Sequence, residues 1–349
     1  MKAISWTTRV GKWFDERADI SGTVTALLHV DIPKNAQTLY LGGLALFFFV
    51  VQSTTGTLLS LYYRGSPEEA YDSILRIMNE VSFGLLIRSI HAWSANLMII
   101  SVVLHLLRIF VQAAYKRPRE LTWMVGLLLL AVTLGFGFTG YLLPWDQRAF
   151  WATTVGTEIA GSVPLIGPSL LQFLRSGPEV TGLTLTRFLG VHMLVLPVTL
   201  VGLLVVHLFL VHRQGLAVPP STPPEKQSAK MPFWPNYLLD ELIAWYVALA
   251  LLVILASLFP AGLEPKANPL STPAHIKPEW YFLSLYQALK LAPRTAILLS
   301  SFAGLSIVFL MPFIDRGPSR EFRQRRGWLM AAVIALTVIA GLSVWGAIS

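Results

Sequence analysis

The stretch FGLLIRSIHAWSANLMIISVVLHLLRIFVQAAY, residues 83–115, carries two histidines inside a long apolar run. A transmembrane helix needs about 20 predominantly apolar residues, so this run is long enough to span a bilayer. His91 and His105 are fourteen residues apart. At about 1.5 Å per residue they are separated by roughly 21 Å, and steps of about 100° return them to nearly the same helix face. The stretch therefore predicts a membrane helix with one imidazole near each surface.

A second stretch, residues 185–212, repeats the pattern with His192 and His207 fifteen residues apart. Two such helices running in the same direction would present two facing pairs, His91 with His192 near the outer surface and His105 with His207 near the inner one. The chain has no cysteine, so a metal cofactor must be held by histidine or carboxylate. The geometry suits two haems with bis-imidazole ligation. The alternative is that each histidine only hydrogen-bonds a neighbouring helix.

Two arginines and four glycines lie at positions that suit such haems. Arg88 is one turn outward of His91 and Arg108 one turn inward of His105. Each is expected to bind haem propionates at its own surface or, alternatively, lipid headgroups. Glycines recur fourteen residues apart in two further apolar runs, and we expect them to make room for both porphyrin faces, unless they serve ordinary helix packing. They are Gly42, Gly56, Gly126 and Gly140.

Seven apolar runs are long enough to span a bilayer. They predict an all-α, polytopic transmembrane bundle of seven helices with a four-helix dihaem core. Hydrophobic residues make up 54% of the chain and charged residues 13%, whereas a soluble domain has about 25% charged residues. The runs cover residues 39–63, 83–115, 121–143, 185–212, 239–260, 295–313 and 328–347.

A Pro-rich linker at residues 213–236 separates the first four runs from the last three and has no apolar run of its own. We therefore expect a dihaem domain at 1–212 and a three-helix domain at 237–349. Lys and Arg are concentrated at 116–120 and 315–326, on one side of the predicted bundle. This places the N-terminus in the cytoplasm and the C-terminus in the periplasm. The first twenty residues are expected to lie on a membrane surface as an amphipathic segment and do not resemble a signal peptide.

Five motifs give essentially the whole chain a resemblance to the cytochrome b family of Rieske/cytochrome b complexes. They are LIRSIHAWSANL at 86–97, KRPRELTW at 116–123, GYLLPWDQ at 140–147, LTRFLGVH at 185–192 and PEWY at 278–281. PEWY with its flanks is the most specific. The histidine spacing and the four-plus-three helix count are most similar to the photosynthetic-type branch, with its two parts fused in one chain.

The resemblance implies a quinol:cytochrome c (or plastocyanin-like) oxidoreductase that couples quinol oxidation to proton translocation in a Q cycle. Quinol would bind at the outer face between GYLLPWDQ, the outer haem and the loop that contains Pro278, Glu279 and Trp280. One electron would pass to a Rieske protein and the other through two b haems to an inner quinone site. Glu279 would accept a quinol proton, because burial raises the pKa of a carboxyl group, or would merely cap an interfacial loop. Tyr281 and Tyr141 would hydrogen-bond or gate the pocket, or belong to an aromatic belt.

Two positions bear on the cofactors and the inner site. Tyr40 stands where photosynthetic relatives carry a cysteine-linked haem, so both b haems are expected to be non-covalent and no covalent haem is expected. His212 stands where the mitochondrial and proteobacterial type has a quinone-binding histidine. With Asp240 or Glu241 as proton donor it would form an inner quinone site; the alternative is a surface histidine at a helix end.

The resemblance also implies partners and a location. We expect the Rieske iron–sulfur protein, a c-type cytochrome subunit or acceptor, quinol and lipid as partners, in a homodimeric complex of a bacterial inner membrane, and no nucleic acid. Two other functions remain: a dihaem membrane anchor of a dehydrogenase, which PEWY and GYLLPWDQ argue against, and a haem-free transporter with a histidine proton relay. His29 and His275 are interpreted as surface residues.

Overall fold

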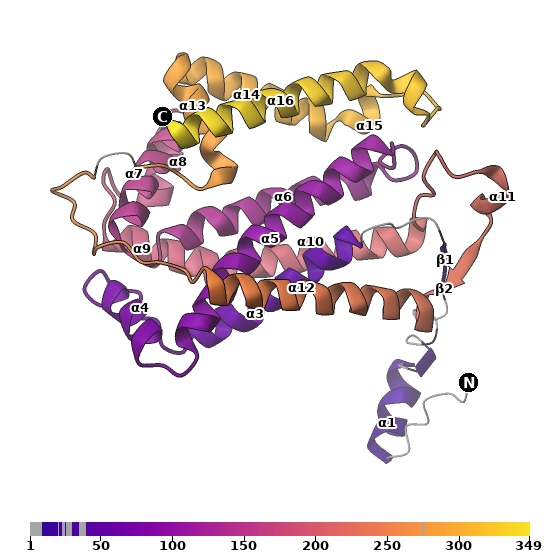
Figure 1. The fold of residues 1–349 in the computed structure, drawn as a ribbon, viewed down its shortest axis with the longest axis horizontal. Coiled ribbons are helices and arrows are strands. Elements are labelled where there is room, and N and C mark those ends of the chain that lie inside the picture. Colours follow the sequence, from indigo (N-terminus) through magenta and orange to yellow (C-terminus); the bar gives the residue numbers. More distant parts are fainter. Residues whose placement is uncertain (1–8, 20, 23–24, 26–29, 35–39, 274–275) are drawn as a thin grey trace.

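The computed structural model describes residues 9–19, 21–22, 25, 30–34, 40–273 and 276–349 and is mostly helical (Figure 1). The expectations for His29 and His275 lie outside these residues. Near the N-terminus, α1 (Arg9–Ala18) projects away from the bundle. Trp13 of this helix is half exposed, and the Arg17 guanidinium lies 4.2 Å from the centre of its ring.

Six helical spans in the described part of the chain are long and apolar enough to cross a membrane. Three are single helices: α3 (Leu41–Ser60), α5 (Gly84–Val111) and α6 (Glu120–Tyr141). The other three are composite. The fourth combines α9 (Gly182–Gly190), η1 (Val191–Val195) and α10 (Leu196–Gln214). The fifth combines η2 (Phe233–Tyr237) with α12 (Leu238–Leu258), and the sixth combines η4 (Phe322–Arg325) with α16 (Arg326–Ile348).

The seventh expected span, at residues 295–313, forms two shorter helices. The first is α14 (Arg294–Phe309), which is apolar but has only 16 residues, and the second is α15 (Met311–Ile314). Pro312 lies at the start of α15, and proline lacks the backbone N–H that would continue the hydrogen-bond ladder of α14. By length, the count of seven spans is therefore not confirmed.

The long helices form a bundle with a distinct cap at each end (Figure 1). One end, here called the outer end, carries α4 (Ala70–Asn79), α7 (Gln147–Gly161) and α8 (Gly167–Arg175). At the opposite, inner end, β1 (Asp31–Pro33) pairs antiparallel with β2 (Lys230–Pro232), close to α11 (Pro224–Gln227). The last helices, α13 (Leu283–Leu291) to α16, lie along one side of the bundle.

Buried apolar side chains hold the middle of the bundle together. One cluster joins Phe47 of α3, Met98 of α5, Leu200 of α10 and Leu252 of α12. Many other aliphatic side chains of these helices are exposed, as expected for surfaces that face lipid tails instead of water.

A buried charge cluster at the inner end fastens the last helices to α5 and α6. The Asp315 carboxylate accepts hydrogen bonds from the Tyr115 hydroxyl at 2.6 Å, from Lys116 at 2.9 Å and from Arg325 at 2.9 Å. Arg325 also donates to the carbonyl of Val111, at the end of α5. Burial pushes the pKa of Asp315 up, but these hydrogen bonds and the charge of Lys116 outweigh it and lower the pKa.

Replacing Asp315 by Asn should destabilise the protein, because breaking a buried ion pair by removing one partner costs about 3–5 kcal/mol. Since the pKa of Asp315 is lowered, its contribution is complete above the pKa of an unfolded aspartate and is lost as the pH falls through the folded value. Thermal unfolding in detergent at neutral pH and at about pH 2, well below the pKa of an unfolded aspartate, would measure both effects.

The matched control is Asp72→Asn, which breaks an ion pair with Lys266 in which both side chains are exposed. Such pairs contribute about 1 kcal/mol or less. Equal losses of stability in the two variants would contradict a specific role for the buried cluster.

Candidate functional site

The four histidines expected to act together do meet inside the bundle. His91 and His105 lie on α5, His192 in η1 and His207 on α10. His91 interacts electrostatically with His192, and His105 with His207. The structure therefore brings together the same outer and inner pairs that the spacing predicts.

Each of the four glycines faces one of these imidazoles. The glycines of α3 face the histidines of α5, and the glycines of α6 face those of η1 and α10. A side chain at any of the four positions would crowd the ring. The distances from an added Cβ to the imidazole Cε1 are 3.3 Å (Gly42, His105), 3.2 Å (Gly56, His91), 3.4 Å (Gly126, His207) and 2.6 Å (Gly140, His192).

A π-turn explains why one histidine spacing is fourteen and the other fifteen. In η1 the Leu196 N–H donates to the Val191 carbonyl, five residues back, immediately before Pro197. A π-turn takes one more residue than an α-turn, and proline, which lacks an N–H, favours such an irregularity. The extra residue falls between His192 and His207, so both rings stay on one face of the span.

The Nδ1 atoms of the two outer histidines contact threonine hydroxyls. Thr55 Oγ1 lies 2.9 Å from Nδ1 of His91, and Thr139 Oγ1 lies 3.0 Å from Nδ1 of His192. Each hydroxyl also donates its only proton to a carbonyl four residues back, at 2.7 Å from Thr55 and 2.8 Å from Thr139. Each threonine must therefore accept from Nδ1–H, which leaves the Nε2 lone pair available for a metal.

The Nδ1 atoms of the two inner histidines are buried and have no hydrogen-bond partner among the described residues. The backbone of Thr122 lies close to the His207 ring. Two pairs of imidazoles provide nitrogen ligands, and the glycine beside each ring leaves space for a flat cofactor. Both features fit the axial ligation of haem.

The two arginines differ in their surroundings. The Arg88 guanidinium donates to the carbonyls of Ala261 and Gly262, at 2.6 and 2.8 Å, in the loop that follows α12. It thus holds this loop against α5 and does not point freely to solvent. Arg108, one turn beyond His105, interacts electrostatically with Tyr237 of η2.

At the outer end, the loop after α12 closes over the segment between α6 and α7. The Asp146 side chain accepts from the backbone N–H of Ala149, which caps α7, and from that of Glu264 in the loop. The Tyr281 hydroxyl lies so close to α6 that an added Cβ on Gly137 would be 2.5 Å from it. GYLLPWDQ and PEWY, distant in sequence, therefore border one site.

Glu279 is largely buried in this site, and burial raises the pKa of its carboxyl group, although the charge of Arg148 partly opposes the shift. Burial also raises the pKa of Tyr281, and the nearby Glu279 raises it further, so this phenol stays protonated. Tyr141 interacts electrostatically with Glu279 as well. A proton acceptor thus lies beside two phenols at the outer end.

Trp280, the remaining aromatic residue of the PEWY segment, points the other way and binds α5. Its Nε1–H donates to the Asn96 side-chain oxygen at 2.7 Å, and the Asn96 amide donates back to the Ala92 carbonyl. Both side chains line an apolar groove of about 470 Å³. Sequence reasoning missed Asn96, Thr55 and Thr139. A threonine directly before each of Gly56 and Gly140 was the available signal for the last two.

The structure does not bring the proposed inner quinone residues into contact. His212 is exposed at the end of α10, and no hydrogen bond or ion pair in the described parts joins it to Asp240 or Glu241. Asp240 accepts a hydrogen bond from the Tyr40 hydroxyl at 3.3 Å, and Glu241 packs against Gly43 of α3. The two acids thus face α3 instead of His212.

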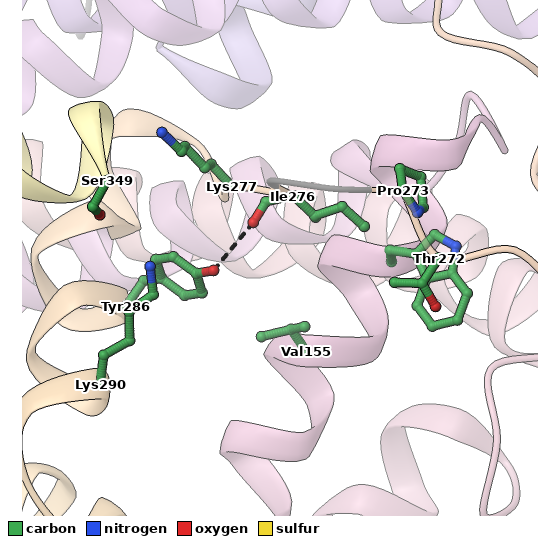
Figure 2. A pocket seen from close by; sticks show the side chains of 9 residues that line it. Val155, Thr272, Pro273, Ile276, Lys277, Tyr286, Lys290 and Ser349 are labelled. Carbon is green, nitrogen blue, oxygen red and sulfur yellow. Dashed lines mark hydrogen bonds between the residues drawn. The ribbon is translucent and has the colours of Figure 1, made fainter.

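A second pocket, of about 350 Å³, opens at the outer end (Figure 2). Val155 of α7 lines one side, and Tyr286 and Lys290 of α13 line the other. The Tyr286 hydroxyl donates to the Ile276 carbonyl at 3.2 Å, and Lys277, directly before the PEWY segment, donates to the Ala347 carbonyl at 2.7 Å. This pocket therefore adjoins the segment that carries Glu279.

A helical bundle with two stacked imidazole pairs in apolar spans defines a class of protein, the haem-binding membrane electron carriers. Comparison with protein families agrees. The model described as cytochrome b/b6/petB matches residues 27–215, and the model described as cytochrome b(C-terminal)/b6/petD matches residues 266–348.

Individual relatives lead to the same family. The cytochrome b subunit of the cytochrome bc complex of Chlorobaculum thiosulfatiphilum is 44% identical over 89% of this chain and 75% of its own length. The menaquinol:cytochrome c reductase cytochrome b subunit of Geobacillus thermodenitrificans is 42% identical over 59% of this chain and 96% of its own. A solved chain of a hyperthermophilic respiratory Complex III has a TM-score of 0.84 at 34% identity and covers 96% of this chain and 91% of its own.

The chain therefore belongs to the cytochrome b/b6 family and contains both the N-terminal and the C-terminal family domain. It is an integral membrane, haem-binding electron-transport protein of the bc-complex type and a redox subunit.

Replacing Gly140 by Ala should displace His192 and lower the haem content of the protein, because the new Cβ would lie only 2.6 Å from the ring. A reduced-minus-oxidised difference spectrum of the purified protein would measure the loss. Gly202→Ala is the control, since no atom lies within 4 Å of the Cβ it would add. Full haem content in Gly140→Ala would show that this glycine does not make room for the ligand.

Proposed function

We propose that this chain is the dihaem core of a quinol:cytochrome c (or plastocyanin-like) oxidoreductase. It would oxidise quinol at its outer face, pass one electron to a Rieske iron–sulfur protein and send the other across the membrane, with proton translocation. His91 with His192 and His105 with His207 would each hold one non-covalent b haem. The haems would supply a one-electron relay between the two faces.

The observation that carries the proposal is the site at the outer end. A membrane anchor or a transporter needs no carboxylate enclosed between the end of α6 and a loop of the last domain. Here Glu279 lies in such a site, beside Tyr141 and Tyr281. The Asp146 side chain fixes the loop to the start of α7. This arrangement favours quinol oxidation over the other two functions.

Quinol oxidation releases two electrons and two protons, so the site needs a proton acceptor. Burial raises the proton affinity of Glu279 above that of an ordinary glutamate, which suits a base that must take a proton near neutral pH. Pro278 and Trp280 flank Glu279, and the Trp280–Asn96 hydrogen bond orients the segment. The protonated phenols of Tyr141 and Tyr281 would hydrogen-bond the quinol oxygen.

The outer pocket in Figure 2 would receive the Rieske protein. The pocket opens to solvent directly beside the PEWY segment, and Trp151 and Val155 on its wall belong to α7, which follows GYLLPWDQ. A partner seated there would lie next to the quinol. A c-type cytochrome would accept electrons from it, in a homodimeric complex of a bacterial inner membrane.

An inner quinone site would use His212 of α10 and Asp240 or Glu241 of α12. His212 and the two acids, Asp240 and Glu241, would approach the quinone from different helices, since they do not contact each other. The excess of Lys and Arg near residues 116–120 and 315–326 supports a cytoplasmic inner end, and hence a cytoplasmic N-terminus and a periplasmic C-terminus.

Replacing Glu279 by Gln should lower quinol:cytochrome c turnover by about 100-fold, because general-base catalysis contributes about that much or more, while both haems are retained. Turnover of the purified complex and a haem difference spectrum would test this. Glu179→Gln, at an exposed position of the same end, is the control. Normal turnover in Glu279→Gln would favour a dihaem anchor instead.

Replacing Arg148 by Gln should move the acidic limb of the pH–rate profile to higher pH. The charge of Arg148 lowers the pKa of Glu279, so its loss raises that pKa, and a higher pH is needed to keep the carboxylate ionised. Arg187→Gln, at a residue that contacts Phe173, is the control. An unmoved acidic limb would mean that Glu279 does not set it.

A further inference from the structure

The two outer histidines differ from the two inner ones in that a hydroxyl group lies at hydrogen-bond distance from Nδ1. All four rings face a glycine, and an arginine lies one turn from one histidine of each pair. Only the outer rings meet hydroxyl groups, those of Thr55 and Thr139. The inner rings, His105 and His207, have no Nδ1 partner within the described residues.

Such a hydrogen bond changes the chemistry of the imidazole as a ligand. An acceptor on Nδ1–H raises the electron density at Nε2 and the basicity of the ligand. Each threonine hydroxyl is itself polarised, because it donates to a carbonyl of its own helix, and polarised hydroxyl groups are better acceptors. A more basic axial ligand stabilises ferric over ferrous iron and lowers the reduction potential.

We propose that Thr55 and Thr139 lower the reduction potential of the outer haem. This rests on the proposed function, in which the histidine pairs hold two b haems. The two threonines are positioning and tuning residues, since they act through His91 and His192.

Valine is the variant of choice, because it keeps the branched shape of threonine and lacks the hydroxyl. Thr55→Val and Thr139→Val should each raise the potential of the outer haem, the double variant more than either, while the inner haem stays unchanged. Spectroscopic redox titration of the purified protein resolves the two haems and does not depend on turnover. Thr55→Ser, which keeps the hydroxyl, should titrate like the unsubstituted protein.

Thr133→Val is the matched control. Thr133 is a buried residue of α6 whose hydroxyl donates to the Leu129 carbonyl at 2.8 Å. It has the same kind of backbone hydrogen bond as Thr139, but no hydrogen bond within the described residues joins it to a histidine. Its substitution should leave both potentials unchanged.

A reciprocal change tests the inner haem. Val125 precedes Gly126 on α6, as Thr139 precedes Gly140 fourteen residues later. Val125→Thr should place a hydroxyl near Nδ1 of His207 and lower the potential of the inner haem. This variant would change the potential of the inner haem and leave that of the outer haem unchanged.

The outcomes separate two failures. Absence of two b-type signals in the unsubstituted protein would overturn the proposed function. If both haems bind and titrate, but Thr55→Val and Thr139→Val move the outer potential no more than Thr133→Val does, the tuning proposal is wrong and the proposed function stands. A shift of both haems together would also overturn it.

Discussion

A histidine inside an apolar bundle is stabilised when its ring nitrogens have partners, because an unpaired polar group costs free energy where water is absent. Four such rings lie here in two pairs, and residues on several neighbouring helices accommodate them. Glycines provide space beside the rings, threonines occupy two of the Nδ1 atoms, and a π-turn keeps His192 and His207 on one face. The Nε2 lone pairs of the outer rings remain for metal ligation.

The part of the site that follows from helix periodicity could be predicted from the sequence. The fourteen-residue intervals place His91 and His105 on one face of α5 and set Gly42 and Gly56 opposite them. These relations depend only on rise and turn per residue. The pairing of α5 with the His192–His207 span also follows, because these are the two apolar runs in the sequence that carry two histidines at such a spacing.

The parts that depend on tertiary contacts or on local irregularity could not be predicted. Helix geometry alone gives no reason for Arg88 to bind the carbonyls of Ala261 and Gly262 instead of facing a headgroup. The π-turn was hidden in a one-residue difference of spacing. The seventh run was apolar enough, but Pro312 divides it. Asp240 and Glu241 face α3 because of the way α12 packs, which no pattern within α12 discloses.

One helix connects the two halves of the proposed site. On α5, His91 faces the bundle interior, while Ser89 accepts a hydrogen bond from the Ala261 N–H and Trp93 donates to the Phe259 carbonyl. Asn96 holds Trp280 on the same side of the helix. His91 and the loop that carries Glu279 are therefore fixed to the same helix. Their relative position does not depend on the flexibility of the loop.

The buried cluster around Asp315 attaches the last helices to the bundle through side-chain contacts and not only through the chain. The last helices are fastened at the inner end by Tyr115, Lys116 and Arg325, and Trp123 of α6 donates to the Val308 carbonyl of α14. If the predicted linker at 213–236 acts as a tether, it raises the effective concentration of one part near the other. Cutting it would cost association entropy but no buried contact of this cluster. The same architecture can therefore be made from one gene or from two.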